Sequence, residues 1–164
     1  YGQDFGYTND PTTLVRCLIQ GENLYVDECI YQRGLLNSDI ASLFEANGLR
    51  KGYDEIFADA AEPKSIDELY SYGWNIKAAP KGQDSILAGI QRVNQYKLHV
   101  TERSINIIKE LKNYKYIEDK NGILTAKPID SFNHAMDAIR YAVMSKLTVD
   151  NNYIFINKQT RKNR

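Results

Sequence analysis

The sequence predicts an α/β domain in which a mixed central sheet is flanked by helices. Three strand-like stretches at the N-terminus are joined by two short turns, which is typical of an antiparallel meander. Helical and strand-like patterns then alternate along the chain, which favours parallel pairing through right-handed crossovers. A long helical pattern closes the sequence, and we expect this helix to pack across the sheet.

The N-terminal strands are predicted at residues 1–8, 12–20 and 24–31. Pro11 ends the turn between the first two strands, because proline cannot donate to a sheet ladder. Gly21 begins the tight connection between the second and third strands. Apolar and polar residues alternate in the third strand, so we expect one of its faces to be exposed.

The middle of the chain alternates between helical and strand periodicity. Ser65 and Glu68 have the spacing of a capping box, so a helix is predicted to begin at Ser65. A later helix is predicted to turn Ile107, Ile108 and Leu111 inward. The predicted helices span residues 38–46, 65–73, 84 or 85 to 95, and 104–113, and the predicted strands span 55–60, 74–79 and 97–100.

The last third of the chain predicts a hairpin, a long helix and a tail. Strand-like residues 114–117 and 123–126 flank Asn121-Gly122, a pair that supports a turn with positive φ. A helix is predicted over residues 131–146. We expect residues 1–149 to form one domain and residues 150–164 to form a basic C-terminal tail. This order of elements is that of the RNase H-like fold, with an extra β-hairpin.

Bulk composition is that of an ordinary globular domain. The chain has 164 residues, 43% of them hydrophobic, and 21 basic residues balance 21 acidic ones. A polyanion would therefore have to be bound by a local patch or through cations. Cys17 and Cys29 lack the spacing of a zinc site and are expected to be reduced, buried thiols.

The sequence has neither a signal peptide nor an apolar run of about 18 residues, so we expect neither secretion nor a membrane partner. Its first residues already read as a strand, without an initiating Met. We therefore expect the chain to be a piece of a longer protein.

Three acidic residues occupy positions where a lone charge is unusual. Asp4 lies within the first strand, Asp59 ends an apolar strand, and Asp137 lies in an apolar stretch of the last helix. Ligand sites in α/β sheets lie beyond the carboxyl ends of strands, and an RNase H-like sheet would bring these three elements together. Clustered carboxylates repel one another unless cations neutralise them. The three acids therefore predict a site for two Mg²⁺ or Mn²⁺ ions about 3.5–4 Å apart that acts on a phosphodiester.

The chain also resembles a known family, the C-terminal nuclease domain of tailed-bacteriophage terminase large subunits, which belongs to the RNase H-like integrase superfamily. The resemblance covers roughly residues 1 to 145. It is carried by residues 4–12 (DFGYTNDPT), 58–66 (ADAAEPKSI), 81–82 (KG), 84–86 (DSI) and 133–141 (NHAMDAIRY). It implies that Asp4, Asp59 and Asp137 are the catalytic metal ligands and that His134 also lies at the metal.

The resemblance implies a biological setting as well. Such domains cut concatemeric viral double-stranded DNA during packaging, in the cytoplasm of the bacterial host. The expected partners are an N-terminal ATPase domain of the same polypeptide, the small terminase subunit, and the portal or procapsid. The chain itself has no G-x-x-x-x-G-K-[ST] phosphate loop.

Other residues are weaker candidates for the same site. His134 lies three residues before Asp137, so both face one side of the helix. Lys64 and Lys81 are expected in loops at the same edge of the sheet, where they could contact DNA phosphates. Arg140 could pair with a carboxylate or with the scissile phosphate. Asp10 could be a fourth acid, or simply a turn residue.

Three alternatives share part of this pattern. The start of the chain is similar to the phosphate hairpin of actin- and hexokinase-like ATPases, but that class needs two such domains to close over a nucleotide. A ribonuclease H, resolvase or transposase would share the chemistry without the NHAMDA segment. A non-catalytic DNA-binding packaging module would bind in a salt-dependent manner without needing divalent ions.

Overall fold

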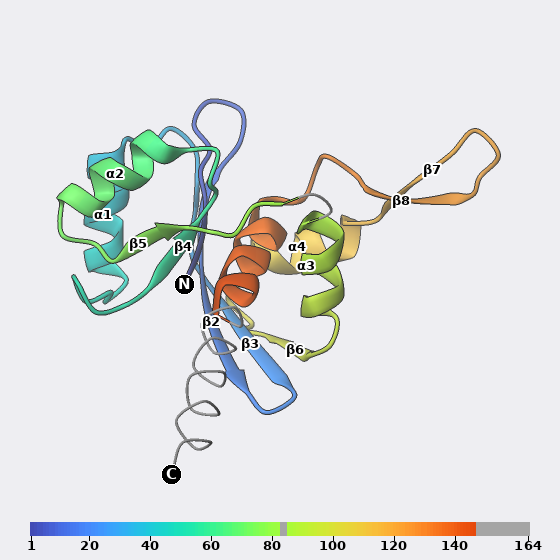
Figure 1. Ribbon diagram of the computed structural model, residues 1–164, viewed down its shortest axis with the longest axis horizontal. Coiled ribbons are helices and arrows are strands. Elements are labelled where there is room, and N and C mark those ends of the chain that lie inside the picture. The colour runs from blue at the N-terminus through green and yellow to red at the C-terminus, as the bar shows by residue number, and fades with distance from the viewer. Residues whose placement is uncertain (83–84, 147–164) are drawn as a thin grey trace, which may run out of the picture.

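A six-stranded mixed sheet forms the centre of the computed structural model, which describes residues 1–82 and 85–146 (Figure 1). The strand order is β5-β4-β1-β2-β3-β6. The strands are β1 (Gly2–Asp4), β2 (Thr12–Gln20), β3 (Asn23–Gln32), β4 (Ile56–Ala58), β5 (Ile76–Ala78) and β6 (Lys97–Val100).

Strand pairing follows the prediction. β1, β2 and β3 form an antiparallel meander. The later strands add in parallel, β4 to β1, β5 to β4, and β6 to β3 on the opposite edge. The first strand is therefore the neighbour of the fourth, which is the adjacency that the predicted site needs.

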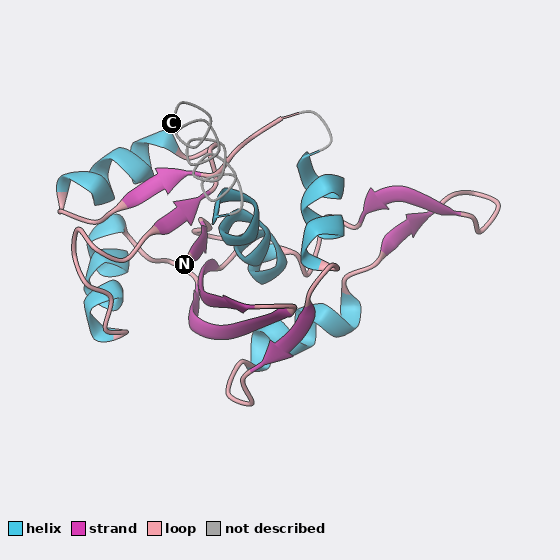
Figure 2. Cartoon of the chain, turned by 60° about the horizontal axis from the view of Figure 1, so that its bottom comes forward, coloured by secondary structure: helices cyan, strands magenta, loops and turns pink. Residues whose placement is uncertain are grey.

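Helices cover both faces of this sheet. They are α1 (Asn37–Ala46), α2 (Pro63–Ser71), α3 (Ser85–Val93), α4 (Ile105–Asn113) and a C-terminal helix at residues 134–146. In Figure 1, α1 and α2 lie on one side of the sheet, and α3, α4 and the C-terminal helix lie on the other. The hairpin of β7 (Tyr116–Glu118) and β8 (Leu124–Pro128) projects away from this body, as Figure 2 shows from a second direction.

Strand alternation builds one apolar core on each face. Consecutive residues Leu14 and Val15 of β2 are fully buried but belong to different clusters. Leu14 packs with Phe44 and Trp74 under α1 and α2. Val15 packs with residues of α4 and the C-terminal helix, among them Ile139.

Two predicted boundaries in the first half are wrong. The first strand was expected over residues 1–8, but β1 ends at Asp4. The chain turns there because the Thr12 hydroxyl binds both the N–H and the carbonyl of Gly6, at 3.2 and 2.6 Å. The capping box at Ser65 is also wrong, because α2 begins two residues earlier, at Pro63. Proline suits a first helical position, since its missing N–H would be unpaired there.

Helix α4 begins after Ser104 as expected, but its buried face differs. Ile107 and Glu110 are fully buried, whereas Leu111 is 39% exposed. The C-terminal helix begins at residue 134 and not at 131, because Phe132 has a φ of 54°. That left-handed conformation is incompatible with a right-handed helix.

The hairpin turn contains the expected positive φ, which is 77° at Gly122. The Asp119 carboxylate also accepts hydrogen bonds from the N–H groups of Asn121 and Ile123, at 2.8 and 2.9 Å. The predicted basic tail at 150–164 lies outside the described residues. Within the described ranges, no helix combines the length and the hydrophobicity that a membrane crossing requires.

Candidate functional site

One polar cleft brings together side chains from three distant segments. Its lining includes Asp4, Asp59, Asp137 and His134, together with Asp10 from the turn before β2. The cleft has a volume of about 550 Å³. The acids predicted to share a site therefore do face one space.

Backbone packing explains this convergence. Asp4 ends β1 and Asp59 follows the parallel β4, where its N–H donates to the carbonyl of Gln3 at 3.2 Å. The C-terminal helix approaches β1 very closely at Gly2. A Cβ atom at Gly2 would lie 1.7 Å from the carbonyl oxygen of Ala138, so only glycine fits there.

Asp4 is the most buried of the acids, at 9% exposure. Burial raises the pKa of its carboxyl to about 6, and the negative charges of Asp137 and Asp59 add to this rise. A hydrogen bond with His134 opposes it, with Nδ1 lying 3.2 Å from Oδ2. Burial and the two neighbouring acids therefore both disfavour the charged form of Asp4.

His134 bridges two acids. Its Nδ1 faces Asp4, and its Nε2 lies 3.5 Å from a carboxylate oxygen of Asp10. The hydrogen bond to Asp4 raises the pKa of His134 despite its partial burial. Asp10 itself is largely exposed, which fits a turn residue at the mouth of the cleft.

Asp137 is paired with Arg140 of the same helix. The Arg140 Nε and Nη2 atoms donate to Asp137 Oδ1 at 3.2 and 2.9 Å. Asn133 donates to the other oxygen at 3.4 Å. Burial nevertheless raises the pKa of Asp137, because it outweighs the effect of the guanidinium.

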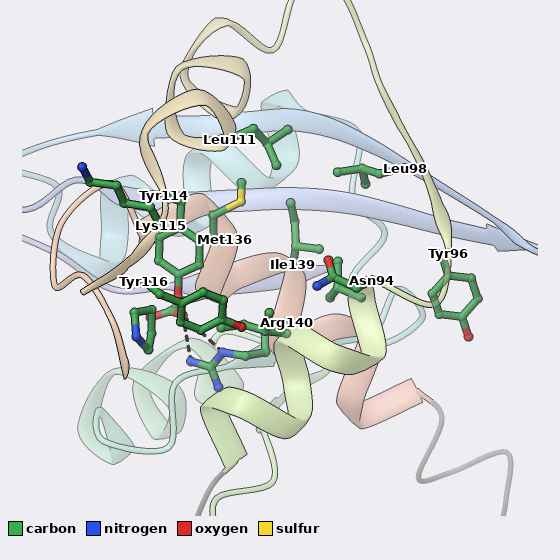
Figure 3. Close-up of a pocket in the computed structure, with 14 residues that line it drawn as sticks. Asn94, Tyr96, Leu98, Leu111, Tyr114, Lys115, Tyr116, Met136, Ile139 and Arg140 are labelled. Atoms are coloured by element: carbon green, nitrogen blue, oxygen red, sulfur yellow. Dashed lines mark hydrogen bonds and ion pairs between the residues drawn. The ribbon is translucent and has the colours of Figure 1, made fainter. Parts of the chain in front are cut away.

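Arg140 also lines an apolar pocket of about 270 Å³, which shares Asp137 with the polar cleft. Figure 3 shows Arg140 among the residues that line this pocket, together with Tyr116 of the hairpin and Met136 and Ile139 of the same helix. The arginine is only 7% exposed, so most of its surface is covered by protein. Its predicted contact with DNA stays a prediction.

The two candidate lysines lie on different elements of the structure. Lys81 is exposed and lines a hollow beside the cleft that also includes Asp59, Asp137 and Arg140. Lys64 is exposed in the first turn of α2, not in a loop as expected. The role of both lysines in DNA binding stays a prediction.

Protein groups engage each of the three central carboxylates. Asp4 contacts His134, Asp137 contacts Arg140, and Asp59 accepts the N–H of Ala61 at 3.0 Å. Among the residues described, no group of three or more His, Cys, Asp or Glu side chains has the geometry to hold one metal ion. A cation shared by these carboxylates would have to replace some of those contacts. Cys17 and Cys29 are free, half-buried thiols.

Two residues of the site were missed by sequence reasoning. Thr13 in β2 donates from its hydroxyl to the carbonyl of His134 at 3.2 Å. Glu110 in α4 accepts hydrogen bonds from the backbone at the start of the C-terminal helix. The available signal for Glu110 was its spacing of three from Ile107, which places both on one face of the helix.

Comparisons with known proteins identify the family of the chain. The family model described as "Terminase RNAseH like domain" matches residues 4–145. The chain is 36% identical over 151 residues to the terminase large subunit of Bacillus phage SPP1, with 86% of the chain and 34% of that protein covered. It is 31% identical over 145 residues to the PBSX phage terminase large subunit of Bacillus subtilis, with 87% of the chain and 33% of that protein covered. The chain thus spans about a third of the length of these relatives.

Solved structures show the same fold. The crystal structure of the g2p (large terminase) nuclease domain from bacteriophage SPP1 with bound Mn matches with a TM-score of 0.77 and 32% identity, covering 86% of this chain and 82% of that one. The large terminase of a thermophilic bacteriophage matches with a TM-score of 0.68 at 20% identity, covering 87% and 38%, and supports the fold alone. The expected RNase H-like fold and terminase resemblance are confirmed, and the chain belongs to the family of terminase RNAseH-like domains.

Proposed function

We propose that this domain is a divalent-metal-dependent endonuclease that cuts viral double-stranded DNA during genome packaging. Asp4, Asp59 and Asp137 hold the ions, and His134 completes the site. The observation that carries the proposal is that these acids line one cleft in a terminase RNAseH-like domain. The similar SPP1 nuclease domain, which was crystallised with bound Mn, supports it.

The donor set fits a divalent cation. Carboxylate oxygens with one imidazole suit Mg²⁺ or Mn²⁺. The raised pKa of Asp4, to about 6, reflects burial and the neighbouring acids, a cost that a bound cation removes. We propose two ions, which would take over contacts now made by Arg140 and Asn133 to Asp137.

Bound divalent ions would activate a water molecule and stabilise charge on the attacking and leaving oxygens of the phosphodiester. The protein groups would hold the carboxylates in place. His134 can orient a hydrogen-bonding group at the mouth, because its second nitrogen faces the exposed Asp10. Lys81, Lys64 and Arg140 would supply positive charge for the DNA backbone.

The wider assembly follows from the relatives' full length. The curated relatives are about three times longer than the match, so we propose that an ATPase domain of the same polypeptide precedes this one. The small terminase subunit and the portal would deliver the DNA. The site of action would be the cytoplasm of the bacterial host.

The test is plasmid digestion in Mn²⁺, in Mg²⁺ and in EDTA. The wild-type chain should nick and linearise the plasmid with metal and leave it intact in EDTA. Asp59→Asn should lower the rate on the order of 10³-fold, because the loss of one ligand removes several kcal/mol of transition-state stabilisation. Asp67→Asn, an exposed Asp in α2, is the matched control and should cut like wild type. Unchanged cutting by Asp59→Asn would refute the site assignment.

A further inference from the structure

The first turn of the C-terminal helix carries both His134 and Asp137, so its position sets two sides of the cleft. A buried carboxylate from another element binds this turn. Glu110 Oε2 in α4 accepts the N–H groups of Ala135 and Met136 at 2.8 and 3.2 Å. These groups have no partner within the helix itself, because the first N–H groups of any helix lack one.

Glu110 is fully occupied by this network. Its second oxygen, Oε1, accepts the hydroxyl of Tyr31 in β3 at 2.8 Å. The residue is only 1% exposed. Burying a carboxylate is unfavourable unless hydrogen bonds compensate, and here the compensating donors are two helix amides and one tyrosine.

Helix α4 is itself held by a carboxylate in the same manner. Glu28 Oε2 in β3 accepts the N–H groups of Asn106 and Ile107, both at 3.0 Å. Its Oε1 accepts the Asn106 side-chain amide at 2.7 Å. The N–H of Glu28 donates to Ser104 Oγ at 2.8 Å. Strand β3 therefore fixes the start of α4, and α4 fixes the start of the C-terminal helix.

The same turn is held from the sheet as well. The Thr13 hydroxyl in β2 donates to the carbonyl of His134 at 3.2 Å. Thr13 is the register partner of Asp4 in the β1–β2 ladder. The backbone around His134 is thus bound on one side by the strand opposite Asp4 and on the other by Glu110.

We infer that Glu110 is a positioning residue, which holds the first turn of the C-terminal helix so that His134 and Asp137 meet Asp4. This inference rests on the proposed function for its consequence in metal binding. Residues that orient metal ligands through hydrogen bonds affect metal affinity by about 10–100-fold. Displacing reacting groups by about 1 Å costs about 100-fold in rate.

The substitution Glu110→Gln separates positioning from packing. Glutamine keeps the shape but is neutral: its one acceptor oxygen can face the two amides only without a negative charge, while its NH2 group would have to donate to the Tyr31 hydroxyl oxygen. Tyr31→Phe is a milder second variant, which removes only one donor and leaves the carboxylate on the helix. Glu118→Gln, an exposed residue of β7, is the matched control.

The experiment combines amide hydrogen exchange with Mn²⁺ titration on the full chain. In Glu110→Gln, exchange at Ala135 and Met136 should rise at least about tenfold relative to Val143 in the same helix, because each loses a charged acceptor. Mn²⁺ affinity should fall about tenfold, and kcat should fall while KM for DNA changes little. Tyr31→Phe should shift the same readouts less, and Glu118→Gln should match wild type.

Two outcomes would overturn the inference. One is unchanged exchange at Ala135 and Met136 in Glu110→Gln. The other is faster exchange with wild-type Mn²⁺ affinity and kcat, which would make Glu110 a structural cap only. If the wild-type chain binds no Mn²⁺, the proposed function fails, and the exchange data still decide whether Glu110 holds the turn.

Discussion

The two faces of the sheet differ in the side chains that are buried against them. Under α1 and α2 the cluster is apolar, and Phe44 packs edge-on against Trp74 with ring centroids 5.1 Å apart. Under α4 and the C-terminal helix the cluster is also apolar, but it includes small residues such as Ala138 and lies alongside the buried charges of Glu110 and Arg140. Both faces belong to one sheet, and the neighbouring residues Leu14 and Val15 of β2 point into opposite clusters.

We infer from this difference that the first face mainly stabilises the fold, whereas the second face also positions the residues of the site. Burial of large apolar side chains stabilises the first face. The second face combines its apolar cluster with buried charged groups that are held by hydrogen bonds. The acids of the site lie where this second layer meets the ends of β1 and β4.

The largest effect on stability is expected from Phe44→Ala, which breaks the first face. Removing a buried phenylalanine lowers the free energy of unfolding by about 4 kcal/mol, through lost burial and a new cavity. Urea denaturation measures this loss. Mn²⁺ affinity of the folded protein should be unchanged, because Phe44 belongs to the cluster on the opposite face from the helix that carries Asp137. Leu18→Ala, at an exposed position, is the control and should change little.

Gly2→Ala probes the closest approach within the second face. The new Cβ would meet the backbone of Ala138, which cannot move aside without the whole helix. We expect a loss of about 3 kcal/mol in the free energy of unfolding. Mn²⁺ affinity should fall as well, because the helix separates from β1. Gly82→Ala, where nothing lies within 4 Å, is the control, and equal losses in the two variants would contradict the account.

Gly89→Ala should give a smaller stability loss and a distinct signature in the site. A Cβ there would lie 2.3 Å from Cγ of Arg140, and we expect the arginine side chain to shift and loosen its pairing with Asp137. The clash is partly offset by the better helix propensity of alanine, for a net loss of about 1 kcal/mol. Mn²⁺ affinity, measured by calorimetric titration, should rise several-fold because a competing cation moves away. A fall in affinity would show that Arg140 supports the site and does not compete there.

The smallest effect is expected from a charge at the rim of the sheet. The Arg103 guanidinium, with Thr101 and Arg16, holds the pKa of Asp27 below its ordinary value of 3.8. A lowered pKa stabilises the fold at pH values above 3.8, and this stabilisation is lost as the pH falls through the folded-state pKa. Asp27→Asn should therefore be slightly less stable than wild type at pH 7. Urea midpoints of the two proteins should converge in acid, and a gap that widens there would reverse the assigned sign.

Much of the fold could be predicted from local patterns. Strand β6 was predicted with its observed limits, residues 97–100, because it lies between two segments with helical periodicity. The boundary of β1 could not be predicted, since it depends on Thr12 binding Gly6 across a turn. The start of α2 was misjudged because the capping-box pattern competed with Pro63 at a first helical position.

The site also contains some residues that local sequence patterns predict and others that they do not. The three acids stood out because Asp4 lies within a strand, Asp59 ends an apolar strand and Asp137 lies in an apolar stretch of a helix. Glu110 did not, because a helix carrying several charges is normally solvated on the charged side. Its compensating donors are 25 residues away at Ala135 and 79 residues away at Tyr31, and no local pattern can reveal them.

The most direct test of the metal site is a crystal of this chain soaked in Mn²⁺, with anomalous diffraction collected to locate the ions. We expect anomalous peaks in the cleft, within coordination distance of carboxylate oxygens of Asp4, Asp59 and Asp137. Peaks only at other surfaces, with the Arg140–Asp137 pair intact and the cleft filled by water alone, would contradict this expectation.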